Sequence, residues 1–144
     1  MAAGWTGYAI PAVTDNFIIS DANLKIVSTA ARTNQVSFGL VKPGSSTVDV
    51  VVFDKGCGLK SNINVVFDDE GATFDCNATN VGASYKPVGN LSSLDGLSSA
   101  GTWILAAKST NAANTITSAT LTLCKTTTTV VLASESFGIN DLVV

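Results

Sequence analysis

Apolar and polar residues alternate along several short stretches of the chain, most clearly over residues 35–41, 47–53, 63–67 and 118–123. A period of two is typical of a β-strand that buries one face and exposes the other to water. The turn sequence Lys42-Pro43-Gly44-Ser45 lies between the first two stretches and predicts a β-hairpin. Short alternating segments separated by turn residues predict an all-β sandwich of about eight strands.

Two other regions give less regular patterns. Residues 17–19 and 24–27 are short apolar runs, and the turn-forming residues 20–23 between them predict two separate strands joined by a turn. Residues 72–86 show no sustained alternation, so we expect an irregular segment on the surface of the domain.

The same patterns set the expected limits of the domain. Residues 1–8 are glycine-rich and are expected to be the end of a linker or tag. The folded domain is expected to extend over residues 9–125. Residues 126–144 begin with four threonines, and they are expected to form either a last strand or a linker.

A large aromatic residue follows a turn of small residues at Gly101-Thr102-Trp103. An aromatic residue at the start of an alternating strand is expected in the core, although Trp103 would also suit a stacking platform for a sugar or a peptide. Asp95 precedes Gly96, and an aspartate in this position commonly closes a turn by bonding its own backbone. We therefore expect structural roles for Trp103, Gly101, Asp95 and Gly96.

A chain of 144 residues is long enough for one domain with its own core. Its composition excludes several classes of function. The net charge of −3 and the scattered lysines give no basic patch for nucleic acid, and no apolar run has the length of a membrane span. The chain has no histidine, which excludes Ser-His-Asp and Cys-His catalysis and the common zinc sites that contain histidine. Chemistry based on lysine or carboxylates survives this exclusion and is judged separately below, and no cofactor other than Ca²⁺, also considered below, is indicated.

The three cysteines, Cys57, Cys76 and Cys124, are too few for a structural zinc site. A thiol nucleophile would need a partner base, and none is evident. We expect one disulfide and one odd thiol, with Cys57 and Cys76 as the bridge because both lie in turn-rich flanks of one strand. Cys124 is then either free or paired outside this chain.

Asp68-Asp69-Glu70 is the densest group of acids in the sequence. Oxygen-rich groups at a strand end can bind Ca²⁺, which takes six to eight oxygen ligands. The alternative is that these acids accept hydrogen bonds from turn and backbone amides or face water. Because successive strand residues point to opposite faces, Asp68 and Asp69 converge only if the strand breaks between them.

The second half of the chain contains the run P-V-x-x-L-S-S-L-D-G, then G-T-W-I-L and finally L-T-L. Together these motifs resemble the P domain that follows the catalytic domain of kexin- and furin-like proprotein convertases. The branch attached to bacterial secreted proteases is the more similar one. Residues 62–70 (NINVVFDDE) are similar to the family's strand that ends in paired acids. The resemblance extends from Ile10 to Cys124, which is nearly the whole chain.

The resemblance implies a jelly-roll topology and a non-catalytic accessory role. The domain would dock on the catalytic domain of a parent protease, a serine or metallo-endopeptidase, stabilise that domain and assist contact with the protein substrate. A secreted or cell-surface location is implied as well. The segment that begins with Glu135-Ser136-Phe137 is similar to sequences before the C-terminal sorting module of some bacterial secreted proteins, so we expect such a module to follow.

Two other function classes remain open at this point. A free-standing adhesin or carbohydrate- or protein-binding jelly roll would align two or three exposed aromatic residues on one face, for which Trp5, Tyr8 and Tyr85 are the candidates. An enzyme that uses carboxylates on a β-sandwich would need two acids facing each other across a concave sheet. Asp49 is the one acid inside the strand stretches, and it is expected to face solvent.

Overall fold

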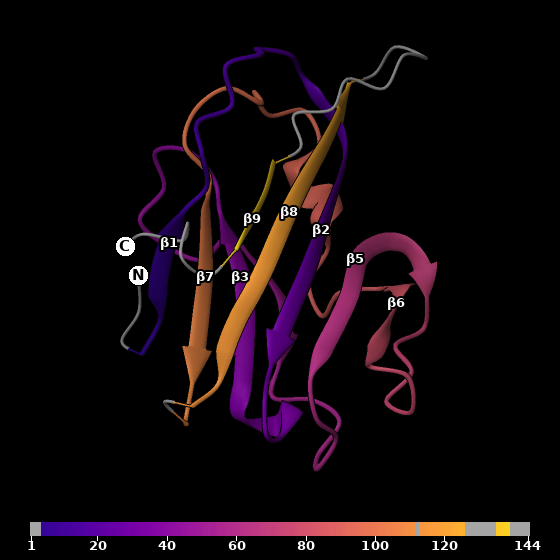
Figure 1. The fold of residues 1–144 in the computed structure, drawn as a ribbon. Coiled ribbons are helices and arrows are strands. Elements are labelled where there is room, and N and C mark those ends of the chain that lie inside the picture. Colours follow the sequence, from indigo (N-terminus) through magenta and orange to yellow (C-terminus); the bar gives the residue numbers. More distant parts are fainter. Residues whose placement is uncertain (1–3, 112, 126–134, 139–144) are drawn as a thin grey trace.

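The computed structural model describes residues 4–111, 113–125 and 135–138. Two β-sheets pack face to face, which confirms the predicted all-β sandwich (Figure 1). The first sheet has the strand order β1 (Thr6–Ala9), β7 (Ile104–Ser109), β3 (Val36–Val41), β4 (Val50–Asp54). The second has the order β6 (Asn80–Tyr85), β5 (Ile63–Ala72), β2 (Ile19–Thr29), β8 (Thr115–Lys125), β9 (Glu135–Gly138).

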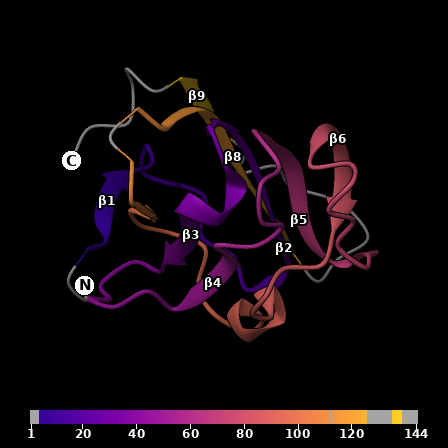
Figure 2. The same ribbon diagram turned by 90° about the horizontal axis from the view of Figure 1, so that it is seen from below.

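Most connections carry the chain from one sheet to the other, as in a jelly roll. Strands β1, β3, β4 and β7 belong to one sheet, whereas β2, β5, β6, β8 and β9 belong to the other. The view along the strands shows the sheets as two layers (Figure 2). Neighbouring strands pair antiparallel except β5 and β6, which are parallel. Two short 3₁₀ turns, η1 (Thr33–Gln35) and η2 (Leu91–Leu94), lie between strands.

The predicted hairpin is present as β3 and β4. Its turn is closed by a hydrogen bond from the amide of Ser45 to the carbonyl of Lys42 (3.1 Å), and Gly44 takes a positive φ of 79°. Proline and glycine in this turn suit that geometry. The returning strand begins at Val50 and not at residue 47, because the Asp49 side chain accepts the Lys42 amide (2.9 Å) and closes a wider turn.

The prediction of two short strands around residues 20–23 is wrong. One continuous strand, β2, extends over these residues and lies between β5 and β8 in the centre of its sheet. Ala22 is 1% exposed, and Asp21 and Asn23 alternate with it toward the outer face. Pairing of Asp21, Ala22 and Asn23 with β8 outweighs the weak strand propensity of these residues.

Two segments differ from expectation, and the C-terminal one takes one of its two expected forms. Residues 6–8, expected in a linker, belong with Ala9 to the edge strand β1 paired with β7. Residues 80–85, expected to be irregular, form β6 beside β5. Residues 135–138 form β9 on β8, while the threonine run at 126–129 and residues 139–144 lie outside the described residues.

The core lies between the two sheets and forms one continuous cluster. The inward rows are the predicted ones: Ile63, Val65 and Phe67 on β5, and Ala119, Leu121 and Leu123 on β8, all at most 1% exposed. Burial of these apolar side chains supplies most of the free energy that favours folding. The described part of the chain includes no helix that is long and apolar enough to cross a membrane.

Trp103 belongs to this core and is 0% exposed, as expected for a structural residue. Its indole Nε1 donates to the carbonyl of Ser99 (2.9 Å), which satisfies the one polar atom of the ring. Gly101 has a φ of 123°, and a Cβ there would lie 2.7 Å from the Cβ of Pro43. Only glycine fits this approach to the tryptophan.

Candidate functional site

An acidic group lies at one end of the second sheet. The carboxylates of Asp21 on β2 and of Asp68 and Glu70 on β5 each offer an oxygen within 4.8 Å of the others. Antiparallel pairing of Leu24 with Phe67 brings these ends of the two strands together. Leu24 and Phe67 point into the core. Side chains at alternate positions, such as Asp21 and Asp68, therefore face outward, where they lie close together.

Asp69 does not belong to this group. Its two carboxylate oxygens accept the backbone amides of Leu91 (2.9 Å) and Ser92 (2.6 Å), which begin the 3₁₀ turn η2. Strand β5 is irregular here, since Phe67 and Ala72 both pair with Tyr85, and Asp69 is bonded toward η2 whereas Asp68 lies beside Asp21 and Glu70. The expected trio of Asp68, Asp69 and Glu70 is therefore corrected to Asp21, Asp68 and Glu70. Asp69 has a structural role.

Repulsion within the group changes the protonation of its members. Loss of water around the Glu70 carboxyl and the nearby carboxylate of Asp21 raise the pKa of Glu70 to about 7, with smaller effects from Asp68 and Asp69. Burial and the charges of Asp21 and Asp69 raise the pKa of Asp95. A proton on Glu70 lets it share a hydrogen bond with Asp21 and lowers the total negative charge.

This protonation predicts a pH-dependent stability. Between its ordinary pKa of 4.5 and about 7, folded Glu70 keeps a proton that the unfolded chain has lost, so stability falls as pH rises through this window. We expect the unfolding temperature to be a few degrees higher at about pH 5 than at about pH 8. Glu70→Gln should flatten this dependence and Asp15→Asn, an exposed acid outside the group, should not. Equal slopes in wild type and E70Q would contradict the assignment.

The group offers three carboxylates for a cation, whereas Ca²⁺ takes six to eight oxygens. Asp69, one of the three acids expected at this site, is already bonded to two amides. We therefore expect the unfolding temperature to be the same in EDTA and in Ca²⁺. A loss of many degrees in EDTA that Ca²⁺ restores would show that this group is a structural ion site.

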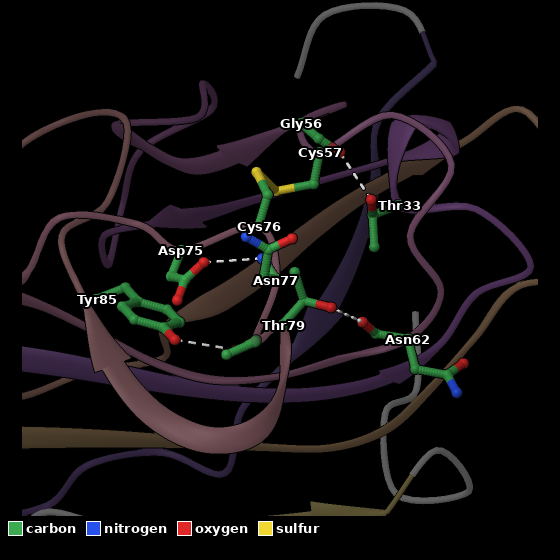
Figure 3. Close-up of a disulfide and its surroundings, with 10 residues drawn as sticks. Thr33, Gly56, Cys57, Asn62, Asp75, Cys76, Asn77, Thr79 and Tyr85 are labelled. Carbon is green, nitrogen blue, oxygen red and sulfur yellow. Dashed lines mark hydrogen bonds between the residues drawn. A yellow bond between two sulfur atoms is a disulfide. The ribbon is translucent and has the colours of Figure 1, made fainter.

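A disulfide joins the segment before β5 to the segment after it, as predicted. Cys57 and Cys76 are bonded, with their Cα atoms 5.1 Å apart, and Figure 3 shows the bridge with the segments that it joins. Hydrogen bonds fix both segments: Thr33 Oγ1 donates to the Gly56 carbonyl (2.8 Å) and Thr79 Oγ1 donates to the Asn62 carbonyl (3.0 Å). Disulfides are typical of proteins in oxidising compartments outside the cytosol. Cys124 is a half-buried free thiol, and burial raises its pKa.

The remaining candidates have other surroundings than expected. Tyr85, a candidate for an exposed aromatic, is 5% exposed and donates from its hydroxyl to the Ala78 carbonyl (3.0 Å), so it belongs to the core. The turn at Asp95 is closed by its backbone amide, which donates to the Ser92 carbonyl (3.0 Å), and no described donor bonds its carboxylate. Gly96 follows with a positive φ of 85°.

An apolar groove of about 320 Å³ lies next to the disulfide. Its walls are Val52, Phe53, Phe74, Pro87 and Val88, together with the two bridged cysteines. The ring of Phe74 packs 5.5 Å from that of Phe53 and 4.9 Å from that of Tyr85, measured between centroids. No local sequence pattern indicates this groove, because Phe74 lies in the segment expected to be irregular and Pro87 directly follows it.

No family model matches this chain, and neither does any curated protein or solved structure.

Proposed function

We propose that this chain is a non-catalytic accessory domain of the P-domain type from a secreted protease. It docks on the protease catalytic domain, stabilises it and assists contact with protein substrate. The sandwich, the extracellular type of crosslink and the P-domain-like run ending at Cys124 support this proposal. The observation that carries it is the apolar groove beside the disulfide.

The groove has the properties of a docking site for an apolar side chain of the partner. Val88 forms one wall and is 69% exposed, whereas Phe53 behind it is 3% exposed. Covering Val88 removes apolar surface from water, which favours association. A large apolar side chain exposed beside a recess is a feature of interaction surfaces.

The groove is held rigidly, which lowers the entropic cost of docking. The amides of Val88 and Gly89 donate to the carbonyls of Val52 (3.0 Å) and Val51 (2.7 Å), so this wall is fixed along the edge of β4. The disulfide fixes the opposite wall, which carries Phe74. Lys86 and Asp54 lie at the rim with exposed charges, and charges in such positions set orientation more than affinity.

The test is the affinity of this domain for the catalytic domain of the protease whose polypeptide contains it, measured by isothermal titration calorimetry. Val88→Asp places a charge in the groove, and we expect affinity to fall at least about tenfold. Val81→Asp is the matched control, because Val81 is 68% exposed on β6 and does not line the groove. Affinity should change little in V81D.

Two results would overturn the proposal. The first is a polypeptide that carries this chain without any protease domain. The second is equal affinity of wild type and V88D for the catalytic domain, since docking would then use another surface. Circular dichroism of both variants verifies that the sandwich is intact before binding is compared.

A further inference from the structure

Strand β1 forms an open edge of the first sheet. It is the last strand in the order β1-β7-β3-β4 and pairs with β7 alone, in unbroken register (Figure 2). Its sequence, TGYA, contains no charged residue and no proline. A sheet edge of this kind offers unpaired backbone groups to another strand.

The backbone groups that face outward from this edge belong to Gly7 and Ala9. The Ile10 amide donates to the Trp103 carbonyl (2.8 Å). Bonded positions alternate along an antiparallel ladder, so Tyr8 also bonds β7, whereas Gly7 and Ala9 point away from it. No described residue bonds the amides or carbonyls of Gly7 and Ala9. The edge therefore offers donors and acceptors at the spacing of a β-strand.

Two other sheet edges are protected against such pairing. Along β4, the amides of Val88 and Gly89 already bond the strand. Strand β6 is irregular, because its register with β5 shifts after Asn80 and Gly82 takes a positive φ of 74°. Covered and bulged edges resist the addition of a strand. Strand β1 has neither form of protection among the described residues.

An added strand would alternate its side chains between the two faces of β1. Tyr8 pairs with the buried Leu105 and packs on the core, so side chains opposite Tyr8 and Thr6 would point inward. There, a cavity of about 390 Å³ lies between the sheets, and its lining includes Thr6, Tyr8, Ala107 and Ile116. This cavity leaves room for short apolar side chains of the added strand.

The outer face beside β1 carries a cation. Ala107 packs toward the core, so its neighbour Lys108 points to the outer face, where its Nζ lies 4.9 Å from the centroid of the Trp5 ring. In the described part of the chain no carboxylate pairs with this ammonium. An acidic side chain at the outward position opposite Trp5 would therefore complement its charge.

We propose that β1 binds an extended segment of another polypeptide, which pairs antiparallel with Gly7 and Ala9 and places an acidic residue opposite Trp5. The unpaired amides and carbonyls select a peptide strand, because a sugar or a nucleic acid has no matching ladder of backbone groups. Within the proposed function this segment belongs to the protein substrate. That assignment rests on the proposed function, whereas peptide binding at β1 does not.

The test is NMR titration of the ¹⁵N-labelled chain with the blocked peptide acetyl-Ser-Val-Thr-Val-Glu-amide. In the antiparallel register its valines lie opposite Tyr8 and Thr6, and its glutamate lies opposite Trp5. We expect shifts confined to β1, β7 and the residues that line the cavity. N-methylation of the central threonine removes the amide that donates to Gly7, so binding should weaken at least about tenfold with the side chains unchanged.

Variants of the chain test the same contacts. Ala9→Pro removes an outward amide but none that bonds β7, and binding should fall at least about tenfold. Ala9→Ser is the matched control and should bind as the wild type does. The wild type should prefer the glutamate peptide about threefold over a peptide with lysine in its place. Lys108→Met should remove this preference, and Lys86→Met should keep it.

Several results would overturn the proposal. These include the absence of shifts at about 10 mM peptide and equal affinity for the N-methylated peptide, which tests the edge even if A9P does not fold. Equal affinity for the glutamate and lysine peptides would remove the role of Lys108. Concentration-dependent shifts at β1 without peptide would assign the edge to a second copy. Tighter binding of a synthetic peptide of residues 139–144 would assign it to the chain itself.

The variant Val88→Asp separates this proposal from the docking function. Peptide binding at β1 should be the same in V88D and in the wild type, because Val88 does not line the cavity beside β1. Loss of docking in V88D without any peptide binding in the wild type would overturn the role of β1 alone. Peptide binding at β1 without docking at the groove would overturn the proposed function alone.

Discussion

Replacement of Trp103 by alanine is expected to lower the free energy of unfolding by about 4 kcal/mol, the largest effect of any single substitution considered for this domain. The indole is 0% exposed, belongs to the core and bonds the Ser99 carbonyl, so its loss leaves a cavity and an unsatisfied buried acceptor. Against a total stability of about 5–15 kcal/mol for a typical domain, this loss is a large fraction.

Urea unfolding followed by far-UV circular dichroism measures this loss. Trp5→Ala is the control, because Trp5 is a half-buried residue that packs on Lys108 at the edge of the first sheet. We expect its cost to be within about 1 kcal/mol. Similar losses for the two tryptophans would contradict the structural role of the buried Trp103. If W103A does not fold, Trp103→Phe provides a milder version of the same comparison.

Removal of the disulfide in the double variant Cys57→Ala/Cys76→Ala is expected to lower the free energy of unfolding by about 3 kcal/mol. The bridge closes a loop between residues 19 positions apart, and opening it increases the conformational entropy of the unfolded chain. For a domain of this size the unfolding temperature should fall by about 10 °C. The segment with Phe74 also loses its covalent anchor, so affinity at the docking groove should fall in parallel.

The matched control is Cys124→Ala, which removes the free thiol and leaves the bridge intact. A reducing agent should bring the wild-type unfolding temperature close to that of the double variant and should leave the double variant unchanged. An unfolding temperature in C57A/C76A equal to that of wild type would show that packing alone holds this end of the domain.

Local alternation of apolar and polar residues predicts a strand when one of its faces packs in the core and the other faces water. Ile63, Val65 and Phe67 alternate in the sequence and are all buried. Strand β2 was not predicted in full, because Asp21 and Asn23 carry a turn propensity that their pairing with the distant strand β8 overcomes. Strand β6 was not predicted, because it is short and mostly exposed and contains glycine and serine at positions where β-branched residues are typical.

The same limits apply to the acidic group. Strand parity is a poor guide at Asp69, because β5 is irregular between Phe67 and Ala72, and it is the amides of Leu91 and Ser92 that hold its carboxylate. Asp21 lies about fifty residues away in sequence, and only the pairing of β2 with β5 brings it to Glu70. The disulfide was predictable because its two cysteines flank one strand. The docking groove was not predictable, because it is formed by loops and strands that no local pattern connects.

The central claim is that this domain stabilises a protease catalytic domain by docking through the groove at Val88. The most direct measurement is the unfolding temperature of that catalytic domain alone, with equimolar wild-type domain, and with Val88→Asp. A ligand that binds only the folded state stabilises it by about 2.7 kcal/mol at a concentration of about 100 times Kd. We therefore expect a rise of several degrees with wild type and a much smaller rise with V88D. An unfolding temperature that is the same in all three samples would contradict the account.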